Sequence, residues 1–246
     1  MSVTTGVFGN MKNKLIMLLA VFSVGIWSAD NEIYLIQSGA NATIDLEQLG
    51  NGNIIGGLNS VSGTLTGLNI TGLAMALDIN QIGNLNKFLG DIYGDSIDGF
   101  FEFDGDSNEF TIQADPTNTY GIDNSSYNVN VSGNTNTFTL NQGTSALAST
   151  LDLDWTINGS SNDLTFNINS DTATNKIDID GDSNTFTYTG SGYANKWLEI
   201  DLTGDSNSAN IQQLSTLVSD WLQINSTGSN SNICVIQNDG GTSTSC

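Results

Sequence analysis

Four aspartates are the side chains of this sequence best suited to hold a metal ion. Asp104 and Asp106 flank one glycine, and Asp180 and Asp182 flank another, each pair within the sequence Asp-Gly-Asp-Ser-Asn. Carboxylate and amide oxygens at alternate positions are ligands that Ca²⁺ prefers. The stretch differs from an EF-hand loop, because the glycine is misplaced and no glutamate closes the loop, and it lacks the glycine-rich nonapeptide of calcium β-rolls. Calcium binding is therefore one hypothesis. An ordinary turn is the other, since these residue types form turns.

Catalysis by a nucleophile and a base finds no support in this sequence. The chain contains neither histidine nor arginine, and a catalytic triad lacks its usual base without histidine. Pairs of acids could serve glycoside hydrolysis, but no acid stands apart from the acids of the turns. No arginine or histidine is present to orient an anionic sugar. We therefore expect no enzyme activity and no cofactor, with calcium as the one exception left open.

The aspartate turns belong to a unit of strand, tight turn and strand that recurs along the chain. In five copies a glycine is followed three residues later by an asparagine, and apolar or small residues stand two and four places outside this pair. Alternation with a period of two indicates half-buried strands. Successive glycines lie 28, 26, 22 and 23 residues apart, which is the spacing of a repeat architecture. The glycines are Gly105, Gly133, Gly159, Gly181 and Gly204, and the asparagines are Asn108, Asn136, Asn162, Asn184 and Asn207.

These repeats predict an all-β fold, a two-sheet β-solenoid in which strand–turn–strand units stack as successive coils. Because side chains along a strand alternate between its faces, each repeat asparagine shares the inward face with the apolar residues. Stacked coils then form an asparagine ladder, in which each side-chain amide bonds to the next. Outward positions form a column of threonines, which suit a strand surface. This column holds Thr111, Thr139, Thr165 and Thr187. An ice-binding face is a further interpretation, which needs regular Thr-x-Thr pairs; they occur at 137–139 and 185–187 but not in the other copies.

The composition excludes several partners. The 246 residues include 5 Lys+Arg against 26 Asp+Glu, and the net charge is −21. Such a chain has little to neutralise phosphates, so we expect no nucleic acid as a partner, and it disfavours anionic lipid. Charged residues make up 13% and hydrophobic residues 38% of the chain, which argues for a folded protein rather than a disordered one.

Residues 1–29 have the three parts of a secretory signal. A short basic stretch at 11–14 precedes an apolar run at 15–25 and a small-residue end at 26–29. Met11 is a candidate for the true start. The apolar run is shorter than a typical membrane-spanning helix. A buried apolar helix is the alternative interpretation of this run. We expect a secreted or cell-surface protein without a stable membrane span.

The rest of the chain divides into three parts. Residues 30–98 are diverged coils, with a short helix considered at 85–92. Residues 99–237 hold the regular coils, with loops at 114–126 and 143–150, and the last unit has one residue too many in its turn. Residues 238–246 form a tail. Its Cys246 is expected to form a disulfide with Cys234, as cysteine pairs of exported chains usually do. Two thiols without histidine do not make a zinc site.

Two segments carry a resemblance to a known family. Residues 48–53 and 81–86 both fit Gln-x-Gly-x-x-Asn, which resembles the curlin repeat, Ser-x5-Gln-x-Gly-x-x-Asn-x-Ala-x3-Gln, over residues 33–237. The five later copies replace the glutamine before the glycine with Asp, Ser, Asn or Thr, and some keep a following glutamine (Gln142, Gln213 and Gln237). The resemblance implies export through an outer-membrane secretion apparatus. It also implies assembly into extracellular amyloid fibres of a biofilm, with copies of itself or with a related repeat subunit.

Three classes of function follow from these observations. The first is a structural protein of curlin type that self-assembles into, or decorates, extracellular fibres by edge-strand stacking. The second is a monomeric surface adhesin or a calcium-dependent binding solenoid. The third, an enzyme acting on polysaccharide, is disfavoured by the missing catalytic side chains.

Overall fold

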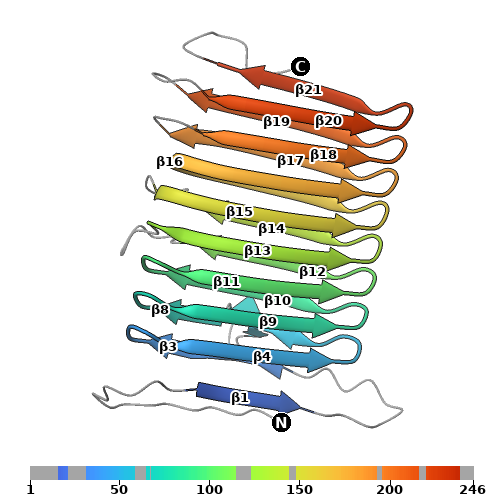
Figure 1. Cartoon of the computed structure of the whole chain (residues 1–246). Helices are drawn as coiled ribbons and strands as arrows, with labels where there is room; N and C mark the ends of the chain where they lie inside the picture. Colours follow the sequence, from blue (N-terminus) through green and yellow to red (C-terminus); the bar gives the residue numbers. More distant parts are fainter. Residues whose placement is uncertain are drawn as a thin grey trace.

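The computed structural model describes residues 16–21, 32–58, 65–66, 68–114, 123–143, 148–192, 196–215 and 220–238. Residues 16–21, 57–58, 65–66, 148–149 and 215 are described by their backbone alone. All regular secondary structure in these ranges is β-strand. The predicted all-β solenoid is confirmed, because its strands stack as successive coils in parallel sheets (Figure 1). The described part of the chain has no helix long and apolar enough to cross a membrane.

The solenoid has two parallel faces, here called sheet A and sheet B. Sheet A consists of β1 (Ile16–Val21), β4 (Thr43–Leu49), β9 (Ala76–Ile82), β11 (Asp98–Asp104), β13 (Ser125–Ser132), β15 (Ala148–Asn158), the second part of β16 (Asp163–Asp180), β18 (Trp197–Thr203) and β20 (Trp221–Thr227). Sheet B consists of β2 (Glu32–Ile33), β3 (Ile36–Ser38), β5 (Ile54–Ile55), β8 (Leu68–Thr71), β10 (Lys87–Tyr93), β12 (Glu109–Ala114), β14 (Thr137–Gln142), the first part of β16, β17 (Thr185–Gly192), β19 (Ser208–Ser215) and β21 (Asn232–Gln237).

Each coil runs from a sheet-B strand to a sheet-A strand and back through a Gly-x-x-Asn turn. These turns stack along one edge of the molecule, on the right in Figure 1. The longer connections, such as those from β12 to β13 and from β14 to β15, leave from the opposite edge. The predicted loops are shorter than expected, since Ala114 ends β12, Ser125 begins β13, and β15 already starts at Ala148. The edge that carries the repeat motif is therefore the uniform one.

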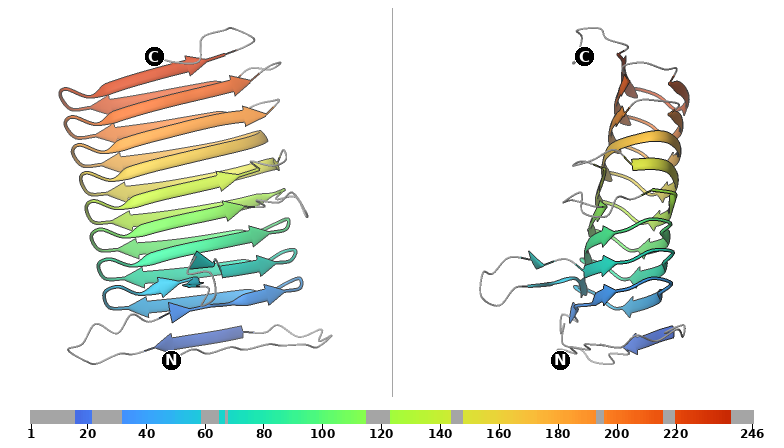
Figure 2. Two further views of the ribbon diagram at one scale, coloured as in Figure 1. Left: turned by 180° about the vertical axis from the view of Figure 1, so that it is seen from behind. Right: turned by 90° about the vertical axis from the view of Figure 1, so that its left-hand side faces the viewer.

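One insertion interrupts a sheet-B strand near the N-terminal end. Strands β6 (Gly57–Leu58) and β7 (Leu65–Thr66) pair antiparallel between β5 and β8. They project away from the two-layered body in the edge-on view of Figure 2. This insertion explains why the repeat is hard to follow between residues 54 and 80 of the sequence.

The helix considered at 85–92 is wrong, because Lys87–Tyr93 forms strand β10. Phe88 and Ile92 are buried on the inward face, with Gly90 between them. The glycine breaks the apolar alternation that marks a strand in sequence. The Phe88 ring fills its place, since a Cβ on Gly90 would lie 2.7 Å from that ring. An aromatic side chain covering a neighbouring glycine is a recognised device of sheets.

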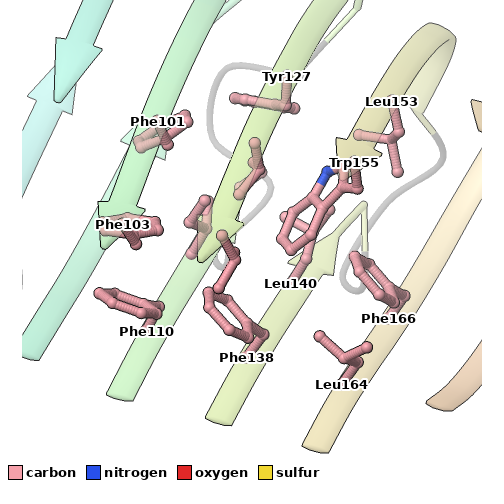
Figure 3. Close-up of a cluster of buried hydrophobic side chains, with 14 of the residues drawn as sticks. Phe101, Phe103, Phe110, Tyr127, Phe138, Leu140, Leu153, Trp155, Leu164 and Phe166 are labelled. Atoms are coloured by element: carbon pink, nitrogen blue, oxygen red, sulfur yellow. The ribbon is translucent and has the colours of Figure 1, made fainter. Parts of the chain in front are cut away.

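The core is a column of aromatic and aliphatic side chains between the two sheets (Figure 3). The ring centroids of Phe103 and Phe110, from opposite sheets, are 3.6 Å apart, and those of Phe110 and Phe138 are 4.7 Å apart. Trp155 meets Phe166 edge to face at 4.4 Å. Each coil thus buries its apolar face against the coils beside it, as repeat architectures do.

The N-terminal edge of sheet A is formed by β1, which belongs to the apolar run of the sequence. It pairs parallel with β4, from Ile16 opposite Thr43 to Val21 opposite Gln48. The remainder of residues 1–29 lies outside the described ranges. The secretory signal therefore remains a prediction.

Candidate functional site: the stacked Gly-x-x-Asn turns

The repeat asparagines lie in one buried column where sheet A passes into sheet B. All five predicted members are at most 2% exposed, and the column continues toward the N-terminus through Asn86 and Asn53. Period-two alternation places them there, because each stands two residues before the first inward apolar residue of its sheet-B strand, as Asn108 stands before Phe110.

The hydrogen bonds of this ladder join a side chain to the backbone of the coil before it. The backbone N–H of Asn108 donates to Oδ1 of Asn136, and the N–H of Asn136 donates to Oδ1 of Asn162, both at 2.8 Å. The same bond occurs at 2.8 or 2.9 Å in every step from Asn53 to Asn207. This differs from the expected amide-to-amide bonding. The reason is that the turn points each buried N–H along the stack, where it needs an acceptor.

A second ladder occupies the position directly after each turn glycine. There the backbone N–H donates back to the side chain of the preceding coil, at 2.6 to 3.0 Å. The two ladders therefore run in opposite directions and bridge successive coils twice. Sequence reasoning missed this ladder, although the position holds a short acceptor side chain in every copy: Asn51, Asn84, Asp106, Asn134, Ser160, Asp182, Asp205 and Ser229.

The second ladder changes the interpretation of the candidate metal ligands. Oδ1 of Asp106 accepts the N–H of Asn134 at 2.6 Å, and Oδ1 of Asp182 accepts the N–H of Asp205 at 2.6 Å. Asp104 and Asp180 are exposed, and their in-register neighbours are not acidic. Within the described ranges no three His, Cys, Asp or Glu residues are grouped so that they could hold a metal ion. The four aspartates are thus not brought together, and two of them serve the turn.

The turn glycines are required by the stacking itself. Gly159 has φ +142°, and a Cβ there would overlap the carbonyl oxygen of Gly133 in the coil below. The other four predicted glycines, Gly105, Gly133, Gly181 and Gly204, combine a positive φ with the same close approach to the preceding turn. L-residues disfavour this backbone region. The glycine column therefore permits the coil spacing that both ladders need.

The glutamine of the Gln-x-Gly-x-x-Asn motif occupies an inward column of sheet A. Nε2 of Gln81 donates to Oε1 of Gln48 at 2.8 Å, which begins a short glutamine ladder. We expected polar residues to replace this glutamine in the later coils, and that prediction is wrong. The register places Phe103 opposite Gln81, and the column continues through Val131, Ile157, Ile179 and Leu202. The polar residues stand one place later and face outward, so the later coils have an apolar core at this level.

The last turn has the normal length, contrary to the expected extra residue. Asn232 lies opposite Ser208, so Ser231 takes the ladder position above Asn207. The glutamine that follows still stacks, since Nε2 of Gln237 donates to Oε1 of Gln213 at 2.9 Å. Cys234 lies on β21. Its expected partner Cys246 lies outside the described ranges, so their disulfide remains a prediction.

The outward face of sheet A stacks carboxylates in register. Asp178 lies opposite Asp201, and Asp45 lies opposite Asp78. Partial burial, and then the charge of Asp201, raises the pKa of Asp178, while Lys176 opposes the shift. Burial and then Asp45 raise the pKa of Asp78. Like charges directly opposite one another destabilise a sheet. These paired carboxylates therefore repel one another at neutral pH and destabilise the folded state.

Replacing Asn162 with alanine should lower the free energy of unfolding by about 1–3 kcal/mol. The change removes the acceptor of the Asn136 N–H and the bond from Nδ2 of Asn162 to the Gly133 carbonyl, which is 3.2 Å long. Chemical denaturation measures the effect. Asn158→Ala is the matched control on the same coil, because Asn158 is exposed and should change stability by less than about 0.5 kcal/mol. Equal effects at the two sites would contradict a role for the ladder.

Comparison with known proteins does not assign a family: no protein-family model, no curated protein and no solved structure matches the chain.

Proposed function

We propose that this chain is a secreted structural protein of curlin type that self-assembles into extracellular fibres by stacking end to end. The observation that carries the proposal is the pair of turn ladders, which repeats the same contacts at every coil boundary. A surface that already binds a copy of itself within one molecule can bind the matching surface of a second molecule. Edge-strand addition of this kind is a common mode of protein association.

The C-terminal end of the solenoid is open in the described part of the chain. Ile233 and Val235 on β21 are 37% and 40% exposed. Their in-register neighbours Ala209 and Ile211 are 2% and 0% exposed. The inward side chains of the last coil therefore lack the cover that the next coil provides elsewhere. A parallel strand in register would bury them and satisfy the free strand edge.

The N-terminal end of a second copy has the complementary features. Its β4 would add to β20, and its β5 and β8 would add to β21 once β2 and β3, which pair with them within the chain, have moved aside. Its turn at 50–53 would then lie above the turn at 228–231. The side chain of Asn53 would then accept the N–H of Ser231, as Asn207 accepts that of Asn184. The hydroxyl of Ser229 would accept the N–H of Asn51, as Asp205 accepts that of Ser229. The opposite directions of the two ladders specify a head-to-tail register.

Strands β1, β2 and β3 block this contact, because β1 pairs with the edge of β4, β2 with β5 and β3 with β8. Removal of residues 1–29, as a secretory signal is removed, would free the edge of β4, and β21 would then displace the short strands β2 and β3. Assembly would then be coupled to export, because fibres would nucleate only after residues 1–29 have been removed.

Negative-stain electron microscopy tests the proposal by comparing the full chain with residues 30–246, each with and without calcium. We expect long unbranched fibres from residues 30–246, and far fewer from the full chain, in which β1 covers the edge. Uniform single particles of residues 30–246 under every condition would contradict self-assembly. A monomeric surface adhesin would then be the better account.

Acidification from pH 7 toward the ordinary carboxyl pKa of 3.8 should stabilise the solenoid and speed fibre formation. The pKa values of Asp78 and Asp178 are raised above the ordinary value of 3.8. The folded state therefore binds these protons more tightly than the unfolded state does. Stability grows as the pH falls through the raised pKa values and is lost as the pH rises through them. Thermal unfolding and fibre lag time measure both effects.

Asp178→Asn should raise stability at pH 7 and weaken its pH dependence. Asp152→Asn is the matched control, because Asp152 is exposed and lies between Ser126 and Thr174, which carry no charge. A pH profile that neither substitution alters would contradict the stacked carboxylates as its source.

A further inference from the structure

Among the lysines of the described residues, Lys196 alone is buried, and it is 1% exposed. It lies just before β18, inside the end of the solenoid opposite the Gly-x-x-Asn turns. Its Nζ makes no hydrogen bond in the described part of the chain, although Oδ1 of Asp220 lies 3.4 Å away. The two side chains are 0% and 6% exposed. A buried amine without a hydrogen bond is rare in proteins and requires an explanation.

Backbone contacts hold these two side chains against each other. The N–H of Lys196 donates to Oδ1 of Asp220 at 3.3 Å, and the N–H of Trp221 donates to the carbonyl of Lys196 at 2.8 Å. The next residues, Trp197 and Trp221, lie in register, and their rings stack at 3.6 Å. The amine nitrogen is thus held 3.4 Å from an oxygen of the carboxyl group that it would attack.

The surroundings favour a reaction over a simple ion pair. Burying two charges costs several kcal/mol per ion, and passing one proton from the ammonium to the carboxylate removes both charges. The backbone N–H of Lys196 polarises the Asp220 carboxyl group, as a donor of an oxyanion hole does. Burial, and then the charge of Asp220, raises the pKa of Tyr188. This phenol therefore stays protonated beside the pair, where it accepts a 2.8 Å hydrogen bond from Nδ2 of Asn175.

We propose that Lys196 and Asp220 form an intramolecular amide bond without another enzyme. After the proton transfer, the neutral Nζ attacks Cγ of the Asp220 carboxylic acid. The new N–C bond forms, the C–O bond breaks, and the departing oxygen leaves with two protons from the former ammonium group as one water molecule. No oxidant, reductant or further reactant is needed. The buried site excludes the water that would reverse the reaction.

The bond would tie β18 to β20 covalently at the open C-terminal end of the solenoid. It would form within one molecule, whether or not copies of the chain associate. Its formation needs the folded state, because only folding brings residues 196 and 220 together. A covalent link at this point would keep the last coils from detaching where they lack a neighbour.

Tryptic peptide mapping of the purified wild-type chain by mass spectrometry tests the proposal directly. Trypsin does not cleave after an acylated lysine, so residues 177–246 should appear as one peptide, lighter than its sequence by one water molecule. Fragmentation should locate the link between Lys196 and Asp220. Separate peptides 177–196 and 197–246 of full mass, with no joined species, would overturn the proposal.

Two variants exclude other sources of water loss. Lys196→Arg keeps the positive charge and the trypsin site but cannot form the amide, so it should release both peptides at full mass. Asp220→Ala removes the carboxyl group and should do the same. A loss of water that persists in both variants, or that leaves cleavage after Lys196 intact, would assign the change to another aspartate. The wild-type map decides the question even if a variant fails to fold.

Discussion

Gly204→Ala should lower the free energy of unfolding by about 2–5 kcal/mol, whereas Gly50→Ala should lower it by only about 1–2 kcal/mol. The two glycines have the same φ of +121° and the same place in a Gly-x-x-Asn turn. Both substitutions therefore carry the strain of an L-residue in this backbone region. They differ in what lies beneath them in the stack.

A Cβ on Gly204 would lie 2.6 Å from the carbonyl carbon of Gly181 and 2.9 Å from Oδ1 of Asp182. A Cβ on Gly50 would have Nδ2 of Asn53, at 3.6 Å, as its nearest described neighbour. Only the first substitution must push two coils apart, which breaks both ladders at that boundary. Urea denaturation of the two variants measures the difference. Equal destabilisation would mean that the close stacking of the turns does not determine the choice of glycine.

Trp155→Ala should cost about 3–5 kcal/mol, the usual range for removing a large core aromatic residue. Trp155 is 1% exposed and packs against Phe138 and Phe166 from the opposite sheet, as Figure 3 shows. Its Nε1 has no hydrogen-bond partner among the described residues. The loss therefore comes from the cavity and from the lost contacts, not from a broken hydrogen bond.

The matched control for Trp155 is Trp197→Ala. Trp197 is 43% exposed, so its truncation leaves no enclosed cavity and should cost clearly less than truncation of Trp155. The midpoints of thermal and urea unfolding, followed by tryptophan fluorescence and circular dichroism, measure both variants. A smaller loss at Trp155 than at Trp197 would contradict a core continuous between the two sheets.

The sequence was sufficient to predict the coil and the inward face, because both depend on local alternation. The parity of Phe110 and Ile112 places Asn108 on the buried side, and the turn glycines follow from the same register. The partner of each ladder bond was harder to predict. It lies in another coil, and local sequence does not show whether a buried N–H meets a side chain or a carbonyl group.

Three features escaped prediction for physical reasons. The acceptors of the second ladder, such as Asp106, are surface turn residues whose bonds appear only when coils are stacked. Strand β10 is hard to recognise in the sequence because Gly90 interrupts its apolar alternation. The ring of Phe88 fills the space that a side chain at residue 90 would occupy. Lys196 and Asp220 each end a connection between sheets, so no repeat spacing aligns them. The two residues are brought together by the parallel pairing of β18 with β20, in which Trp197 lies opposite Trp221.

Electron microscopy of residues 30–246 that carry Gly50→Ala tests head-to-tail stacking most directly. In a stack, the Cβ of residue 50 would overlap the carbonyl group of Gly228 in the preceding copy, as a Cβ on Gly228 would overlap that of Gly204 within the chain. We predict folded single particles for the variant under conditions in which the unsubstituted residues 30–246 form long fibres. Fibres of equal length and number from both proteins would contradict the stacking of the turn at 50–53 on the turn at 228–231.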